Sequence, residues 1–82
     1  MEIDCDAQGQ WTSVEDPGGV PASIVPAGVK QYVDSVYKGR TIVKIERERQ
    51  GYDVELYGKI NLIFSHDGSF IREDYKIIEV EL

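Results

Sequence analysis

The chain has few of the residues from which catalytic and metal sites are commonly built. Among its 82 residues there is one cysteine, Cys5, and one histidine, His66. A single cysteine cannot form an internal disulfide or a cluster of thiolate ligands. Because Cys5 alternates with Ile3 in an apolar pattern, we expect its side chain to be a small buried hydrophobe. These absences exclude a scaffold held by internal disulfides and a cysteine-based metal centre.

The chain also lacks an excess of positive charge and any long apolar run. Its net charge of -6 and pI of about 4.6 argue against nucleic-acid binding, which needs a basic surface. The same charge disfavours anionic membrane surfaces. No apolar run approaches the roughly 20 residues of a membrane-spanning helix, and no basic segment followed by an apolar one marks a signal peptide. We therefore expect neither nucleic-acid binding nor membrane insertion.

One hairpin pattern is present twice, 59 residues apart when measured from Gly9 to Gly68. The two copies read Ile3-x-Cys5-x-x-x-Gly9-x-Trp11 and Leu62-x-Phe64-x-x-x-Gly68-x-Phe70. In each, an alternating strand enters a three-residue turn that ends in glycine, which suits a type I turn followed by a left-handed residue. This pairing would set Cys5 opposite Trp11, Ile3 opposite Ser13 and Phe64 opposite Phe70. This repeated pattern predicts that residues 1–16 resemble the closing hairpin of a preceding repeat.

The segment between the two hairpins is predicted to contain a helix, a break and a second helix. Pro21 and Pro26 each suit the start of a helix and push the preceding residue out of helical angles. Apolar residues then recur at i, i+3, i+4, i+7 and i+8 of one helix, at Val29, Tyr32, Val33, Val36 and Tyr37. Lys38 and Gly39 supply the last-turn cation and the C′ glycine that end this helix.

From Thr41 onward the apolar residues alternate with a period of two, which predicts strands. A turn at Gln50-Gly51 would place Ile45 opposite Leu56, and a three-residue turn at 57–59 would align Leu56 with Ile60. The element order is then ββ-α-ββββ. We therefore predict the α+β class, an antiparallel sheet with a helix-break-helix layer on one face.

The whole chain, residues 1–82, is expected to form a single domain. Its repeat core is placed at residues 20–75. Residues 76–82 alternate less cleanly and are interpreted as a strand extension or a tail.

Several segments, in this order, resemble the PepSY-like domains, which are related in fold to the beta-lactamase inhibitor protein family. They are Trp11, the Val20 to Pro26 stretch, Tyr32-Val33, Ile42 to Glu46, Gly51 to Leu56 and the Phe64 to Phe70 hairpin. The resemblance covers roughly residues 1–74. The chain differs from these domains at one turn, where Gly58 precedes Lys59 in place of the usual Asn-Gly pair.

The resemblance implies helical elements on a four-stranded antiparallel sheet, often in tandem, in a periplasmic or secreted bacterial protein. It also implies a role in binding or inhibiting other proteins, and it carries no catalytic residues and no cofactor.

Two chemical motifs in the sequence also have simpler interpretations. Asp4, Asp6, Gln8, Gly9 and Glu15 match positions 1, 3, 5, 6 and 12 of a calcium-binding EF-hand loop. An EF-hand needs an entering helix, and only three residues precede Asp4, so we favour a simple hairpin and assign no metal. His66 is flanked by serines and Asp67, but a hairpin tip offers no shaped pocket. We therefore expect an exposed turn residue and assign no catalytic role.

The sheet face away from the helix carries the candidate binding residues. The expected register sets Glu46 opposite Glu55 and Glu48 opposite Asp53, and like charges directly opposite are mildly destabilising. Either Lys44, Arg47 and Arg49 neutralise this cluster, or it is an acidic docking surface for a basic partner. Apolar residues on the same face would add contact area, with Ile63 paired to Ile71 near Tyr57. The predicted partner-binding residues are Glu46, Glu48, Asp53, Glu55, Tyr57, Ile63 and Ile71.

The sequence thus leads to two functional hypotheses. The first is a non-enzymatic module of the bacterial cell envelope that binds, and in one version inhibits, a protein partner through its exposed sheet face. The alternative is a structural repeat unit that forms homo-oligomers through its sheet edges or faces.

Overall fold

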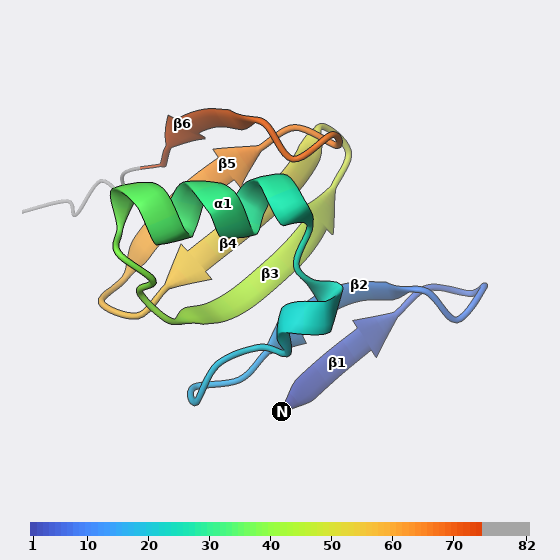
Figure 1. Ribbon diagram of the computed structural model, residues 1–82. Coiled ribbons are helices and arrows are strands. Elements are labelled where there is room, and N and C mark those ends of the chain that lie inside the picture. Colours follow the sequence, from blue (N-terminus) through green and yellow to red (C-terminus); the bar gives the residue numbers. More distant parts are fainter. Residues whose placement is uncertain (75–82) are drawn as a thin grey trace, which may run out of the picture.

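A computed structural model describes residues 1–74 and places one helical layer on one face of a six-stranded sheet (Figure 1). The elements are β1 (Glu2–Cys5), β2 (Trp11–Glu15), η1 (Ala22–Ile24), α1 (Ala27–Val36), β3 (Ile42–Glu48), β4 (Gly51–Leu56), β5 (Ile60–Phe64) and β6 (Phe70–Glu73). All neighbouring strands are antiparallel, and their order in the sheet follows the sequence. The α+β class and the order ββ-α-ββββ are confirmed. The predicted extension or tail at 76–82 lies outside the described residues.

The helical layer is interrupted as the two prolines predict. Pro21 precedes the 3-10 helix η1, and Pro26 precedes the ten-residue α1. Between them Val25 is extended, with φ -82° and ψ 122°, because the residue before a proline is kept out of helical angles. After α1, Lys38 and Gly39 both take positive φ values of 52° and 73°, which turns the chain toward β3.

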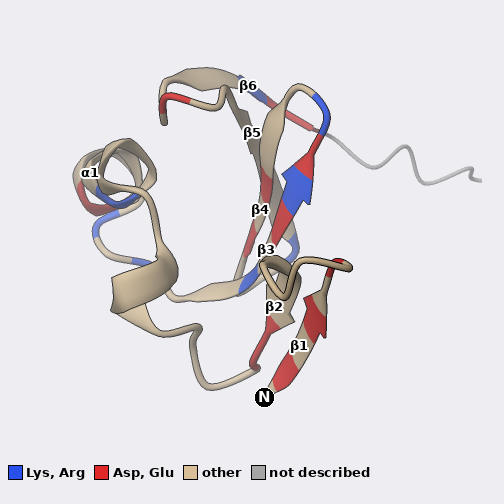
Figure 2. Cartoon of the chain, turned by 90° about the vertical axis from the view of Figure 1, so that its right-hand side faces the viewer, with Lys and Arg blue, Asp and Glu red and all other residues tan. Residues whose placement is uncertain are grey.

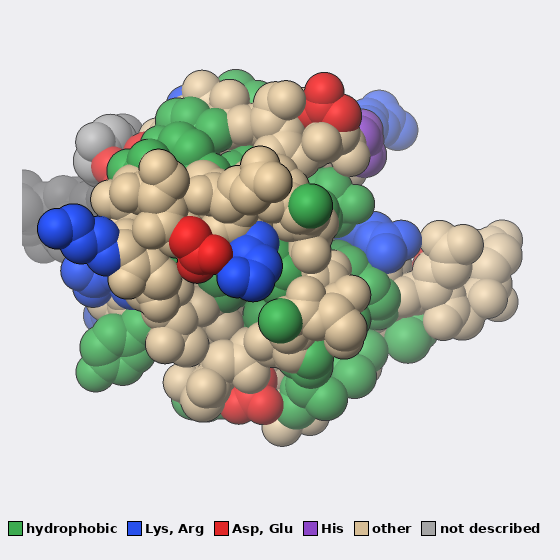
Figure 3. Space-filling view, in the orientation of Figure 1, with side chains coloured by type: hydrophobic (Ala, Val, Ile, Leu, Met, Phe, Trp, Pro, Cys, Tyr) green, Lys and Arg blue, Asp and Glu red, His purple; other side chains and the backbone are tan. Residues whose placement is uncertain are grey.

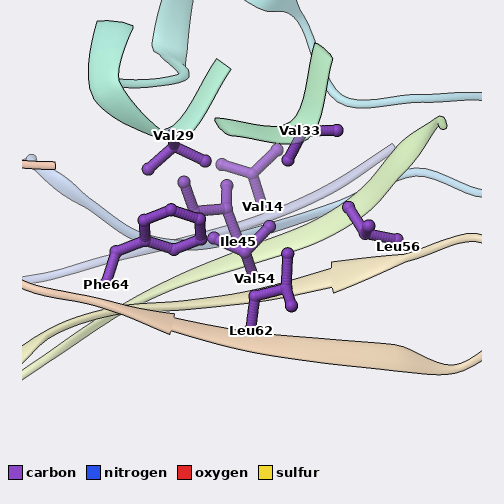
Figure 4. Close-up of a cluster of buried hydrophobic side chains, with 8 residues drawn as sticks. All are labelled: Val14, Val29, Val33, Ile45, Val54, Leu56, Leu62 and Phe64. Carbon is purple, nitrogen blue, oxygen red and sulfur yellow. The ribbon is translucent and has the colours of Figure 1, made fainter. Parts of the chain in front are cut away.

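The core lies between α1 and strands β2 to β5. Eight apolar side chains, each 2% exposed or less, meet there (Figure 4). They are Val14, Val29, Val33, Ile45, Val54, Leu56, Leu62 and Phe64. Two come from α1 and point at the strands, where alternate residues face the helix. The sheet therefore has one covered face and one open face.

Three of the predicted strand registers differ from the structure, and one of them joins β3 and β4. Ile45 lies opposite Val54, so the prediction that it faces Leu56 is wrong. The connecting turn is Arg49-Gln50, and Gly51 is already the first residue of β4. A Cβ on Gly51 would lie 1.9 Å from the Phe64 carbonyl oxygen, so the close approach of β5 leaves room only for glycine at this strand position. A shift of two residues keeps every side chain on its predicted face.

The two hairpins also differ from the predicted pairing, in the same way. Cys5 lies opposite Trp11, as predicted, but Ile3 lies opposite Val14 in place of Ser13. In the second hairpin Phe64 lies opposite Phe70, as predicted, and Ile63 lies opposite Arg72. Each hairpin contains a β-bulge directly after the aromatic residue, at Thr12 and at Ile71, and the extra residue shifts the register by one. The predicted pair of Ile63 with Ile71 is therefore wrong.

The predicted pairs between β4 and β5 agree with the structure. Leu56 lies opposite Ile60 and Val54 opposite Leu62, across the three-residue turn at 57–59. One burial prediction is wrong, because Cys5 is exposed. Strand β1 is exposed along its whole length, and α1 lies over β4 and β5 instead (Figure 1).

Candidate functional site

The open face of the sheet carries two rows of mostly polar side chains that run across the strands. One row joins Lys44 of β3, Glu55 of β4 and Asn61 of β5. The adjacent row begins with Glu46, opposite Asp53, and continues to Ile63. Figure 2 shows α1 standing off the other side of the sheet, with acidic positions along β1, β3 and β4.

The two rows enclose a pocket of about 170 Å³. Its lining is Lys44, Glu46, Asp53, Glu55 and Asn61. Glu46 Oε1 lies 3.2 Å from Lys44 Nζ. The pocket therefore holds three carboxylates and one ammonium group, all within the described residues.

The charges of the pocket perturb two of its ionisable groups. Burial, followed by the negative charge of Glu46, raises the pKa of Asp53 above its ordinary value. The hydrogen bond and charge of Glu46 raise the pKa of Lys44, with smaller contributions from Glu15 and Glu55. Lys44 is thus shared among several carboxylates. Its charge lowers the pKa of Asp53, but this effect is smaller than the combined effect of burial and the neighbouring carboxylates, so the pKa stays raised.

Asn61 forms the floor of this site and is its least expected member. The residue is 7% exposed, and its Nδ2 is the one buried side-chain polar atom in residues 1–74 that lacks a hydrogen bond. Leaving a buried amide donor unsatisfied costs about 1–3 kcal/mol. A hydrogen-bond acceptor brought by a ligand would recover part of this cost.

The structure brings three of the predicted binding residues together and separates the other four. Glu46, Asp53 and Glu55 line the pocket, although Glu46 faces Asp53 and Glu55 faces Lys44, so the predicted pairing is wrong. The remaining four are Glu48, Tyr57, Ile63 and Ile71.

These four residues lie in different environments. Glu48 is at the end of β3, opposite Gly51 and not opposite Asp53. Tyr57 is 67% exposed in the turn after β4, four residues beyond Asp53, or roughly 13 Å along a strand. Ile63 lies opposite Asp53 but is only 7% exposed, so it contributes little free apolar surface. Ile71 is 50% exposed at the edge strand β6.

Two residues of the pocket were missed as site members. Asn61 lies between the inward-facing Ile60 and Leu62, so the alternation already placed it on the open face. The correctly predicted register of β4 and β5 would have set it beside Glu55. Lys44 was considered only as a neutralising charge.

The two chemical motifs form ordinary turns. Asp6 Oδ1 accepts hydrogen bonds from the backbone N–H groups of Gln8, at 2.9 Å, and Gln10, at 3.0 Å. No group of three or more His, Cys, Asp or Glu side chains in residues 1–74 is arranged to hold a metal ion. His66 Nε2 lies 2.7 Å from the Arg49 carbonyl oxygen, while the Ser65 hydroxyl donates to Asp67. The histidine therefore links two turns and is not engaged with a serine.

Comparison with known proteins gives a consistent family. The family model described as "Putative beta-lactamase-inhibitor-like, PepSY-like" matches residues 1–72. A comparison with curated proteins finds no match. No helix in the described part of the chain is long and apolar enough to cross a membrane.

Three crystal structures of Bacteroides proteins resemble the chain. A "putative periplasmic protein of unknown function" from Bacteroides vulgatus is 27% identical, with a TM-score of 0.84, over 89% of this chain and 59% of that protein. A second "putative periplasmic protein" from the same organism is 31% identical, with a TM-score of 0.81, over 89% and 58%. A "putative calcium-regulated periplasmic protein" from Bacteroides thetaiotaomicron is 32% identical, with a TM-score of 0.78, over 85% and 56%.

In each of these structures the region matched by the chain is less than two thirds of the protein's length. The family description names an inhibitor-like and not a catalytic protein. The match over residues 1–72 and the shared fold together show that this chain belongs to the PepSY-like, beta-lactamase-inhibitor-like family.

Proposed function

We propose that the chain is a non-enzymatic protein-binding module of the bacterial cell envelope, and that the pocket on its open sheet face receives a basic side chain of the partner. The observation that carries the proposal is the convergence of three carboxylates around the unsatisfied amide of Asn61. The envelope location is supported by the periplasmic descriptions of the solved relatives. The non-enzymatic role is supported by the inhibitor-like description of the family.

A lysine or arginine in an extended segment has the chemistry that this pocket lacks. Its cation would pair with Asp53 and Glu55 and relieve the repulsion that raises the pKa of Asp53. Its backbone carbonyl groups are acceptors of the kind that Asn61 Nδ2 needs. The net charge of -6 would also speed the approach of a basic partner at low salt.

The test compares the removal of two charges at the pocket with the removal of two charges elsewhere. The pocket variant is Glu46→Gln with Asp53→Asn, and the control variant is Glu2→Gln with Asp34→Asn. The probes are synthetic ten-residue alanine-glycine peptides with a central pair of lysines, arginines or glutamates. Binding is followed by the NMR signals of the Asn61 side-chain amide.

We expect the basic peptides to shift these signals in the wild-type chain and in the control variant. The pocket variant should bind them at least tenfold more weakly, and the glutamate peptide should leave the signals unchanged. Equal binding of the basic peptides by the pocket and control variants would refute the proposal. Pull-down from an envelope extract with the same two variants extends the comparison to natural partners.

A structural repeat unit is the second candidate function. The observation that favours it is the identity of register and bulge position between hairpin β1–β2 and hairpin β5–β6. In this version the edge strands β1 and β6 would pair with other copies or repeats. Light scattering at millimolar concentration tests self-association, and a strictly monomeric chain would argue against edge pairing between copies.

A further inference from the structure

The two hairpins have the same backbone arrangement, but their first strands, β1 and β5, are covered to very different extents. In hairpin β5–β6, Leu62 and Phe64 are fully buried. Their counterparts 59 residues earlier are Ile3, which is 50% exposed, and Cys5, which is exposed. Figure 3 shows apolar side chains gathered on the surface over the base of hairpin β1–β2. The uncovered face of this hairpin is therefore an apolar surface whose counterpart, within the same chain, is buried.

Helix α1 is what covers the second hairpin, and it does so through two specific contacts. Gly28 of the helix packs on the backbone of Gly68, so closely that a Cβ on Gly28 would lie 2.4 Å from the Gly68 carbonyl oxygen. Four residues later, Tyr32 stacks on Phe70 with 4.1 Å between ring centroids and packs edge-on against Phe64 at 5.6 Å. A glycine and an aromatic residue one helical turn apart thus fit one glycine and one aromatic residue of the hairpin.

Hairpin β1–β2 presents the same features without a helix over its tip. Gly9 has φ 81°, close to the 87° of Gly68, and nothing lies within 4 Å of the Cβ position at Gly9. Trp11 occupies the position of Phe70 and is partly buried, while Phe70 itself is 36% exposed, so the difference in burial between the hairpins lies in their first strands. Its contacts are with Arg47, whose guanidinium lies 4.1 Å from the ring centroid, and with Tyr52 at 6.4 Å. The Cys5 side of the hairpin remains open.

We propose that Ile3, Cys5, Gly9 and Trp11 form a docking surface for an amphipathic helix of the α1 type, carried by a second unit of the same fold. The helix would place a glycine over Gly9 and an aromatic residue, one turn later, over Trp11. This inference rests on the repeat-unit candidate and is independent of the acidic pocket, which lies on the opposite face of the sheet. The occupant is a helix because the matching hairpin, with the same register, bulge and turn glycine, is covered by one.

The test supplies such a helix in a defined register. Residues 1–61 are fused directly before Ile3 of the chain, so that Ile3 follows Asn61 as Leu62 does naturally. The upstream unit carries Cys5→Ala, which leaves the downstream Cys5 as the only thiol. The measurement is the rate at which this thiol reacts with Ellman's reagent, compared with the unmodified 82-residue chain.

We expect the thiol of the fusion to react at least tenfold more slowly, because Cys5 becomes covered as Phe64 is. Gly28→Val in the upstream unit alone should restore the fast rate, since a side chain there prevents the glycine contact. An equal rate in the fusion and the single chain, or a slow rate that survives Gly28→Val, would overturn the proposal. The edge-pairing test by light scattering has a separate outcome, because it concerns the strand edges of the single chain.

Discussion

Hairpins β1–β2 and β5–β6 show how one local structure can occupy two different environments. In both, the residue before the turn and the residue after it are joined by a 2.8 Å backbone hydrogen bond, from Asp6 to Gln10 and from Ser65 to Ser69. In both, the turn glycine donates a 3.0 Å bond to the carbonyl group three residues earlier. Yet the first hairpin projects from the body of the molecule and the second lies beside α1 (Figure 1).

The comparison separates the forces that shape a hairpin from those that bury it. The turn is set by residues within a few positions of one another, including a side-chain acceptor at its first position. Asp6 Oδ1 accepts from Gln10 N at 3.0 Å, and Ser65 Oγ accepts from Ser69 N at 3.3 Å. Burial depends on helix α1, which ends more than 20 residues before the hairpin begins. Local chemistry therefore builds the hairpin, and tertiary packing decides what it contributes to stability.

The largest expected contrast is between truncations at equivalent positions of the two hairpins. Phe64→Ala should lower the free energy of unfolding by about 3–5 kcal/mol, because a fully buried aromatic ring is lost and a cavity remains. Cys5→Ala should change it by less than about 0.5 kcal/mol, because the side chain is exposed. Urea denaturation followed by circular dichroism measures both. Similar losses at the two positions would show that the hairpins are equally covered in solution.

The next contrast concerns the glycine contact that only the second hairpin makes. In an exposed helix, replacing glycine with alanine stabilises by about 1 kcal/mol. Gly28→Ala should instead destabilise by about 1–3 kcal/mol, since the new methyl group would overlap the Gly68 backbone. The control is Gln31→Ala on the exposed side of the same helix, which should be close to neutral. A stabilised Gly28→Ala variant would mean that α1 stands farther from the hairpin than the structure places it.

A smaller contrast is expected for the side chains that begin the two turns. Loss of the turn hydrogen bonds in Asp6→Ala or Ser65→Ala should cost about 1 kcal/mol each. The location of the effect should differ, because β1 of the first hairpin is exposed and β5 of the second belongs to the core. Hydrogen exchange should report faster opening confined to β1–β2 for Asp6→Ala and faster opening of β4 to β6 for Ser65→Ala. If both variants increased the exchange rate over the same strands, the two hairpins would not open independently, and the prediction would be wrong.

The smallest effect is expected on the open sheet face that both hairpins extend. The pKa of Asp53 is raised in the folded chain by burial and by nearby carboxylates, including Glu46, Glu48 and Asp74. Its ionisation therefore opposes folding above this pKa, so Asp53→Asn should stabilise the chain at pH 7. The gain should be at most about 1 kcal/mol, because the group is partly exposed and solvent screens its charge.

The pH dependence of the stability of Asp53→Asn shows whether the stabilisation comes from the lost charge. As the pH falls through the raised folded-state pKa and below the ordinary value of 3.8, Asp53 becomes protonated in both states and the gain should disappear. Thermal unfolding at pH 7 and pH 3 measures this difference against Glu2→Gln, an exposed acidic control. A gain that persists at pH 3 would show that packing, and not charge, is responsible.

Much of the fold followed from the sequence alone, while most of the candidate site did not. The periodicity of Val29 and Val33 located the helix, and the alternation around Val54 located a strand. The acidic residues of the open face were identified, but their partners were not, because a register error of two residues leaves the faces unchanged. Asn61 gave no signal by itself, since a polar residue on an open face is ordinary until its burial is known.

The sequence by itself determined the order of elements, the inward face of each strand and the chemistry of the turns, because these depend on backbone angles and on spacings of a few residues. Only the tertiary structure decided the β3–β4 register, in which Gly51 lies in β4 against the backbone of Phe64. Only the tertiary structure also decided which hairpin has its first strand buried. Both depend on contacts between segments far apart in the chain. The same hairpin pattern therefore has its first strand buried in β5–β6, where α1 covers it, and exposed in β1–β2, where α1 does not.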